Sequence, residues 1–114
     1  MVGPIDAAAS GIAAAQRKIE VSAHNIANQD TDEFKKSRVS QQESVSGGVE
    51  TSVGRVSERG HVRQTPEGDQ VESSNVNIAE EMLNLMEAER SLEANIAVLE
   101  TADEAERSLL DIFV

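Results

Sequence analysis

The sequence contains no cysteine, tryptophan or tyrosine, and its two phenylalanines, Phe34 and Phe113, are the only aromatic residues. The absence of cysteine excludes disulfide bonds and thiolate metal sites. Because apolar residues make up only 39% of the 114 residues, a core must be built from Ala, Val, Ile and Leu and will be thin. We therefore expect the folded chain to depend on association for much of its stability.

Long apolar runs and basic clusters are also scarce. No apolar run approaches the roughly 18 residues that a transmembrane helix requires, so direct membrane insertion is not expected. The first residues have neither the basic region nor the apolar stretch of a cleavable secretory signal. The formal net charge is −11, and the one basic cluster, Lys35, Lys36 and Arg38, lies beside acidic residues. Nucleic-acid binding needs clustered Lys and Arg, so we do not expect it here.

Residues with catalytic or metal-binding chemistry are few and scattered. His24 and His61 are the only histidines, and neither belongs to a His-x-x-x-His pair or to an acid–His–nucleophile series. No phosphate-loop pattern follows Gly47 and Gly48. We therefore expect no catalytic, cofactor-binding or metal site, and we expect His24 to interact with the negative end of a helix dipole.

The segment 75–114 contains neither Gly nor Pro, and its apolar residues recur at spacings of four and three, as on one face of an α-helix. The members of this stripe are Ile78, Met82, Leu85, Leu92, Ile96 and Leu99, with an interruption at Glu89, and it continues to Leu109, Ile112 and Phe113. Asn77 is placed to act as N-cap and Glu80 as the acid of a capping box. We predict a helix from Ile78 to Ile112, about 50 Å long, which needs a partner along its length.

A second apolar series predicts a helix from Ile5 to Ala27, about 35 Å long. Pro4 suits its first turn, because the missing N–H would be unpaired there anyway. The series consists of Ile5, Ala8, Ile12, Ala15, Ile19 and Ile26, with Ser22 as its polar member. The many Ala residues and Gly11 allow another helix to approach closely. We expect Asn28 to end the helix in a left-handed conformation.

Between the two helices the chain is predicted to form a short β-rich excursion. Residues 40–48 are polar and end in two glycines, so we expect a loop there. Alternating β-branched residues predict a strand over 49–56. Segments 61–64 and 70–73 are expected to form a hairpin around the turn sequence Thr65-Pro66-Glu67-Gly68.

Chain order predicts the architecture. The first helix leaves, the excursion reverses the chain and the second helix returns, so the two apolar stripes meet most simply as an antiparallel, coiled-coil-like pair. The expected fold is mainly α with a small β-rich insertion. It divides into segments 1–39, 40–74 and 75–114, in which helices 5–27 and 78–112 form one core domain. The second helix is longer, so part of its stripe overhangs as an association surface.

Side chains on these stripes and at the end of the first helix are our candidates for packing between subunits. They are Ile12, Ile19, Asn25, Ile26, Asn28, Phe34, Lys35, Met82, Leu85, Leu92, Asn95, Ile96, Leu99, Leu109 and Phe113. The two asparagines of the first helix end, Asn25 and Asn28, have two readings, namely local capping or polar contacts that fix the packing register between subunits.

The charge of the second helix suggests how it is aligned. Residues 75–114 carry ten acids and two bases, which gives a charge of −8. We expect assembly to bring this helix against Arg17 and Lys18, or against the Lys35–Arg38 segment of a neighbouring chain.

Two motifs resemble a known family. The stretch Ser22-Ala23-His24-Asn25-Ile26-Ala27-Asn28, followed by Thr31 and Phe34-Lys35, is similar to the N-terminal signature of bacterial flagellar rod and hook proteins. The C-terminal signature of that family is similar to Ser74-Asn75-Val76-Asn77, Glu81-Met82, Ala88, Arg90, Glu93-Ala94-Asn95 and Thr101-Ala102-Asp103-Glu104. The short middle segment resembles the small proximal-rod, FlgC-like members. The family usually has Gly, which permits a positive φ, where this chain has Glu33.

The resemblance implies a structural axial subunit of the flagellar basal-body rod. Such a protein is exported unfolded through the flagellar type III apparatus, without cleavage of a signal. In the periplasm it polymerises through packed N- and C-terminal helices into a helical tube that transmits torque. The implied partners are further copies of the chain, other rod and hook–basal-body proteins and the export apparatus.

Two other functions stay open at this point. A non-flagellar helical hairpin could form a closed oligomer that acts as an adaptor or cap, and it would differ from a rod subunit by its point-group symmetry. An enzyme is disfavoured, since no acid, base and nucleophile can be assembled from these residues.

Overall fold

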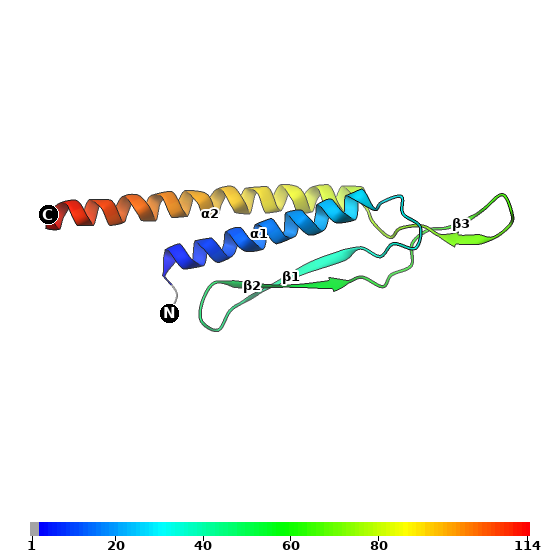
Figure 1. Cartoon of the computed structure of the whole chain (residues 1–114), viewed down its shortest axis with the longest axis horizontal. Coiled ribbons are helices and arrows are strands. Elements are labelled where there is room, and N and C mark those ends of the chain that lie inside the picture. Colours follow the sequence, from blue (N-terminus) through cyan, green and yellow to red (C-terminus); the bar gives the residue numbers. More distant parts are fainter. Residues whose placement is uncertain (1–2) are drawn as a thin grey trace.

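The computed structural model describes residues 3–114 as two long helices with short strands between them (Figure 1). The elements follow in the order α1 (Pro4–Ala27), β1 (Ser37–Glu43), β2 (Val49–Arg55), β3 (Val62–Gln64), β4 (Gln70–Glu72) and α2 (Ile78–Phe113). The predicted fold class, mainly α with a small β-rich insertion, is confirmed. Both helices begin and end within one residue of the predicted bounds.

The two helices run antiparallel, and a ribbon of β1 and β2 lies along the other side of α1 (Figure 1). Within residues 3–114 the ribbon packs along α1 and approaches α2 only at the start of β1, where Arg38 lies 3.9 Å from Glu80, so α1 forms the central layer. The molecule is elongated, with extents of 79 × 24 × 14 Å. In this described range no helix is long and apolar enough to cross a membrane, and no three His, Asp or Glu side chains are grouped to hold a metal ion.

Small residues form the seam between α1 and α2. Ala8, Ala15 and Ala88 are 3%, 1% and 1% exposed. Gly11 faces Asn95 so closely that a β-carbon on Gly11 would lie 2.6 Å from the Asn95 side-chain nitrogen. The close approach predicted for this face is confirmed at Gly11. It brings the two backbones together but buries little apolar area per residue, because Ala side chains are short.

The face that α2 turns toward α1 differs from the predicted apolar stripe. The buried and half-buried residues of α2 that recur at three- and four-residue spacing are Glu81, Leu85, Ala88, Leu92, Asn95, Leu99 and Ala102. Met82 and Ile96, which belong to the predicted stripe, are 57% and 42% exposed. The Ala-rich face of α1 accommodates Ala88 at close range but not a long Met side chain. In addition, Glu81 finds a polar partner in the seam, which the apolar pattern could not indicate.

The loop predicted for residues 40–48 is wrong over its first half, because β1 extends to Glu43. It pairs antiparallel with β2, with Val39 opposite Val53 and Gln41 opposite Thr51. Most of its side chains are polar, since the ribbon is largely exposed, so no apolar alternation marked it as a strand. The turn is fastened to α1, where the Ser10 hydroxyl accepts a hydrogen bond from the Val49 N–H at 3.1 Å.

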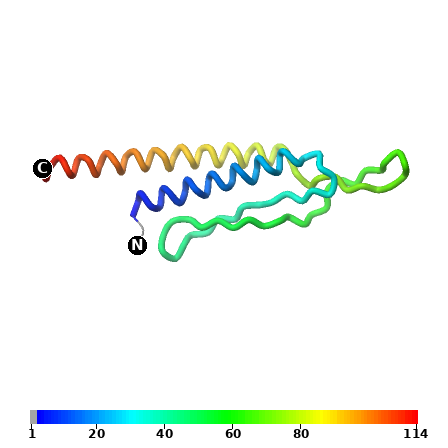
Figure 2. Tube along the Cα trace, in the orientation of Figure 1, coloured from blue at the N-terminus to red at the C-terminus, as the bar shows by residue number. Residues whose placement is uncertain are grey.

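The predicted β3–β4 hairpin is present, and it projects beyond the end of the helix pair (Figure 2). The turn sequence closes as expected, with the Gly68 N–H donating to the Thr65 carbonyl at 2.9 Å. Gly68 has a φ of 92°, in the left-handed region that Gly adopts without strain. Because these strands pair only with each other among the described residues, the hairpin depends on contacts at its base.

Asn28 ends α1 without the left-handed conformation expected for it. Its φ of −107° and ψ of 16° lie on the right-handed side, and its N–H donates to the carbonyls of His24 and Asn25. The turn then continues, with the Thr31 N–H donating to the Asn28 carbonyl at 3.1 Å. The positive φ falls instead at Glu33, at 62°. This is the position at which the resembled family usually has Gly.

Candidate functional site

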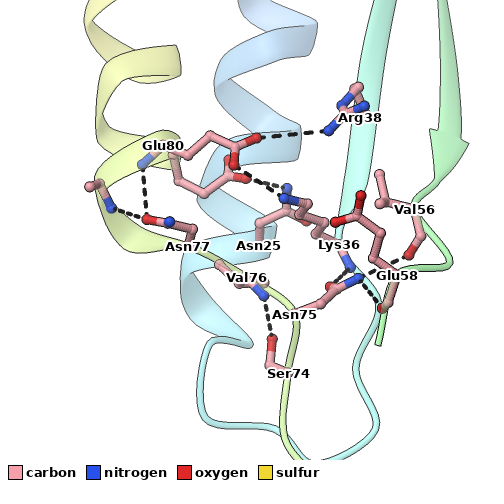
Figure 3. Close-up of polar contacts among 12 residues, drawn as sticks. Asn25, Lys36, Arg38, Val56, Glu58, Ser74, Asn75, Val76, Asn77 and Glu80 are labelled. Carbon is pink, nitrogen blue, oxygen red and sulfur yellow. Dashed lines mark hydrogen bonds and ion pairs between the residues drawn. The ribbon is translucent and has the colours of Figure 1, made fainter. Parts of the chain in front are cut away.

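Asn25 joins three elements where the helices meet β1 (Figure 3). Its side chain lies in the last turns of α1 and is 1% exposed. The amide nitrogen donates to the Ser37 carbonyl at 2.8 Å and to Glu81 Oε1 at 3.1 Å, and the Ser37 N–H donates to Oδ1 at 3.0 Å. One amide therefore pairs with the β1 backbone much as a neighbouring strand would, and it also holds α2. We call Asn25 and the polar residues around it the junction.

Glu81 is the acidic member of the junction and is 2% exposed. Its Oε1 accepts the bond from Asn25, while its Oε2 has no hydrogen-bond partner in the part of the chain that the structure describes. A buried carboxylate is costly unless it is hydrogen-bonded, so the Asn25 amide is essential to its burial. The contact therefore fixes the rotation of α2 about its own axis.

The start of α2 is held by a cap and by ion pairs. Asn77 Oδ1 accepts hydrogen bonds from the N–H groups of Ala79 and Glu80, at 3.0 and 3.3 Å. Glu80 does not complete the expected capping box among residues 3–114. Its carboxylate lies 3.2 Å from Lys36 Nζ and 3.9 Å from Arg38 Nη2 (Figure 3). A cation within reach makes a stronger partner for a carboxylate than the neutral Asn77 N–H.

Asn75 fastens the segment that enters α2 to the segment that leaves α1. Its Oδ1 accepts a hydrogen bond from the Lys36 N–H at 2.7 Å. Its Nδ2 donates to the carbonyls of Val56 and Glu58, each at 3.0 Å (Figure 3). Its own N–H donates to the Phe34 carbonyl at 3.3 Å. A single residue thus satisfies backbone groups of two connecting segments, the one that follows α1 and the one that follows β2.

Glu72 anchors the β3–β4 hairpin beside the junction. Its carboxylate accepts hydrogen bonds from Lys35 Nζ and, at 2.9 Å, from the Gly60 N–H, while Arg59 lies 3.8 Å away. The bond from Lys35 first, and then that from Gly60, holds the pKa of Glu72 below its ordinary value. A β-carbon on Gly60 would lie 1.9 Å from the Ser73 carbonyl oxygen, so this crossing requires Gly.

Two further contacts fix the turn after α1. The rings of His24 and Phe34 meet edge to face, with centroids 5.6 Å apart. Arg63 Nη2 donates to both carboxylate oxygens of Asp32, at 2.9 and 2.7 Å, and this raises the pKa of Arg63. His24 lies in the last turn of α1, so it is near the helix C-terminus, but its contact with Phe34 was not predicted.

The structure divides the candidate packing residues into three groups. Asn25 is buried in the junction and Lys35 binds Glu72, so both make contacts within the chain, and contacts between subunits at these positions stay a prediction. The half-buried candidates are Ile12, Ile19, Ile26, Asn28, Phe34, Leu85, Leu92, Asn95 and Leu99. The exposed candidates are Met82, Ile96, Leu109 and Phe113. Among the candidates, only the exposed group presents large apolar surface to another chain.

Several basic residues that we expected to contact a neighbour are paired inside the chain. Lys18 Nζ lies 3.8 Å from a Glu87 oxygen, and Lys36 is bound to Glu80. Charge reversal at Lys36 would therefore disturb the fold before it disturbed association.

Sequence reasoning assigned no role to Lys36, Asn75 or Glu81 within the fold. Asn75 and Glu81 lie inside the C-terminal motif that carries the resemblance, so the motif marked these positions without indicating what their side chains do. Lys36 had no local signal, because its partner is 44 residues away in the sequence.

At its other end, α2 extends beyond the start of α1 (Figure 2). The large side chains of this segment, 109–113, are strongly exposed: Leu109 by 56%, Leu110 by 63%, Ile112 by 75% and Phe113 by 84%. We call residues 109–113 the overhang. An exposed apolar segment of this kind is typical of an interaction surface.

Two protein-family models match the chain, one at each helical end. Residues 5–35 match the family described as flagella basal body rod protein, and residues 69–112 match the C-terminal family of flagellar basal body rod FlgEFG proteins. Together the matches span more than half of the chain and include Asn25, Phe34, Asn75 and Glu81. No curated protein matches the sequence.

Proposed function

Because the chain belongs to the flagellar basal-body rod protein family, we propose that it is an axial subunit that polymerises through its terminal helices into a helical tube which transmits torque. The family is one of structural basal-body proteins, and we propose a role without catalysis or cofactor. The proposed partners are further copies of this chain, other rod and hook–basal-body proteins and the export apparatus.

The observation that carries this proposal is the uncovered overhang of an otherwise paired helix. Within the chain, Ala102 is the last half-buried residue of α2, and all of residues 103–114 are exposed. Beyond this point the large apolar side chains of Leu109, Leu110, Ile112 and Phe113 are each more than half exposed. Burial of this segment requires another chain, and burial of apolar surface is the main driving force for association.

The short middle segment supports a more specific proposal, a small proximal-rod subunit of the FlgC-like type. Residues 28–77, between α1 and α2, contain two hairpins and no further domain. A subunit of this shape adds little width to a tube wall. We also propose that it reaches the periplasm through the flagellar export apparatus without signal cleavage. The mass of the protein isolated from basal bodies tests this, since an intact N-terminal segment is expected.

Electron microscopy of the assembled protein tests polymerisation. The protein would be concentrated alone and together with neighbouring rod proteins, and its assemblies imaged. A helical lattice is the expected result. Closed rings or dimers with point-group symmetry would instead favour the alternative of an adaptor or cap oligomer, because closed assemblies cannot extend into a tube.

A further inference from the structure

A second exposed apolar patch lies near the start of α2. Met82, Leu83 and Met86 are 57%, 59% and 53% exposed. Leu83 follows the buried Glu81 by two residues, and Met86 precedes the buried Ala88 by two. Two residues correspond to about 200° around an α-helix, so both side chains lie on the side of α2 opposite α1. We call Met82, Leu83 and Met86 the outer face.

No described element covers the outer face. The β1–β2 ribbon lies on the far side of α1, and the β3–β4 hairpin projects from the end of the helix pair (Figure 1). Of the three side chains only Met82 belongs to the predicted apolar stripe, and it lies outside because the Ala seam rotates α2 relative to that stripe. Three large apolar side chains exposed together in a chain with a thin core indicate an interaction surface.

Charge distinguishes the outer face from the overhang. Arg90 lies one turn after Met86 on the same side of α2, and it makes no ion pair within residues 3–114. Asp111 lies between Leu110 and Ile112 in the overhang and is likewise without an ion pair in the described part of the chain. An apolar patch with an unpaired base and an apolar segment with an unpaired acid are complementary surfaces.

From these observations we infer that the overhang of one copy docks on the outer face of a second copy, with Asp111 against Arg90. The inference rests on the proposed polymerisation and names the surfaces that carry it. The two surfaces differ, so their contact is heterologous and leaves a free overhang and a free outer face for further copies. With Asp111 level with Met86, parallel copies would be displaced by 25 residues, about 38 Å along the helix axis. Arg90 would then lie four residues, about 6 Å, from the level of Asp111, a distance that its long side chain can span.

Cysteine cross-linking tests the contact directly, because the natural chain has no cysteine. The single variants Met86→Cys and Phe113→Cys would be mixed in equal amounts, assembled and oxidised, and the disulfide-linked products identified by mass spectrometry. The matched control replaces Met86→Cys by Val45→Cys, a fully exposed position at the tip of the β1–β2 ribbon that is more accessible to a second chain than Met86. We expect the mixed disulfide, which joins position 86 of one copy to position 113 of another, to exceed the control product at least fivefold.

Electron microscopy of the same samples separates this inference from the proposed function. Helical assemblies without the mixed disulfide above the control would overturn the docking contact and leave polymerisation intact. A predominance of disulfides between two Met86→Cys chains would also overturn it, since it would show a two-fold contact between outer faces. The mixed disulfide in closed rings would support the contact while contradicting the tube. If neither the mixed disulfide nor any assembly formed, both the docking contact and the proposed polymerisation would be overturned.

A charge exchange tests the polar part of the contact without cysteine. Arg90→Glu is expected to weaken assembly about threefold, as the loss of an exposed ion pair does. Adding Asp111→Arg to the same chain should restore it, because the pair is then reversed rather than removed. Equal weakening by Arg90→Glu with and without Asp111→Arg would show that the two side chains do not meet.

Discussion

Polar side chains fix the first turns of α2. Asn77 binds the backbone of α2 itself, Glu80 binds the Lys36–Arg38 segment at the start of β1, and Glu81 binds Asn25 of α1. In the last turns of α2, the apolar side chains of residues 109–113 are each more than half exposed and cannot make polar contacts of this kind. The same helix therefore ends in two different ways. Directional hydrogen bonds specify one arrangement inside the chain, whereas non-directional apolar surface is suited to burial against other chains.

Asn25→Ala should have the largest effect on the polar end of α2. This change removes three hydrogen bonds and leaves the buried Glu81 carboxylate without a partner. We expect a loss of about 3 kcal/mol in the free energy of unfolding, measured by urea titration at low protein concentration.

Asn28→Ala provides the control for that experiment. Asn28 is half-buried, and its amide nitrogen donates to the His24 carbonyl at 2.9 Å near the surface. Its replacement should cost less than about 1 kcal/mol. Equal losses in the two variants would contradict the central role of Asn25.

Gly60→Ala tests the second polar anchor, at the base of the β3–β4 hairpin. A β-carbon there would collide with the Ser73 carbonyl, which is backbone and cannot swing away. The hairpin must shift, at a cost of about 2 kcal/mol, and the Gly60 N–H then loses Glu72. NMR shifts should change throughout the hairpin and little in α2. Gly54→Ala is the matched control, since nothing lies within 4 Å of its β-carbon position, and an equal effect there would refute the steric argument.

Glu33→Gly should stabilise the protein by up to about 1 kcal/mol. Glu33 has a φ of 62°, in the left-handed region that costs a residue with a β-carbon about that much. The gain is partly offset by the greater freedom of Gly in the unfolded chain. Glu67→Gly, at an exposed turn position without positive φ, should instead be neutral or destabilising. Thermal unfolding of both variants decides the sign, and a destabilised Glu33→Gly would be the contrary result.

Acidification should loosen the hairpin before the rest of the molecule. Hydrogen bonds from Lys35 and Gly60 lower the pKa of Glu72 from its ordinary value of 4.5, so its contribution to stability is present above that pH. The contribution is lost as the pH falls through the lowered pKa, because the protonated carboxyl no longer accepts both bonds as an anion. The NMR shift of the Gly60 amide should therefore titrate with a midpoint below pH 4.5. A midpoint at or above pH 4.5 would indicate that the Lys35 contact does not persist in solution.

Much of the fold was accessible from the sequence. The alternation of apolar residues and the N-cap at Asn77 predict both helices, and the pattern Thr65-Pro66-Glu67-Gly68 predicts the hairpin turn. β1 was missed because an exposed polar ribbon leaves no apolar alternation. The rotation of α2 was missed because it depends on small residues of α1 and on a buried Glu81, which are properties of the pair rather than of either helix.

The candidate site was harder to predict from the sequence, because it too depends on contacts between the two helices. Asn25 and Glu81 are separated by 56 residues in the sequence, and nothing local distinguishes a polar residue that will be buried from one that stays in solvent. The family resemblance marked both positions without a role inside the chain. Only the contact itself shows that Asn25 acts within the chain, and the exposed apolar residues are therefore the surface that we propose for assembly.

Phe113→Ser, at the apolar end of α2, should have the smallest effect on the monomer. Phe113 is 84% exposed, so its removal should change the free energy of unfolding at low concentration by less than about 0.5 kcal/mol. Leu92→Ser, on the half-buried seam, should cost about 2 kcal/mol or more in the same assay. Assembly should be weakened more by Phe113→Ser than by Leu92→Ser, because Phe113 contributes its apolar area only when a second chain covers it. A Phe113→Ser variant with an unstable monomer would mean that the overhang already has a partner within the chain.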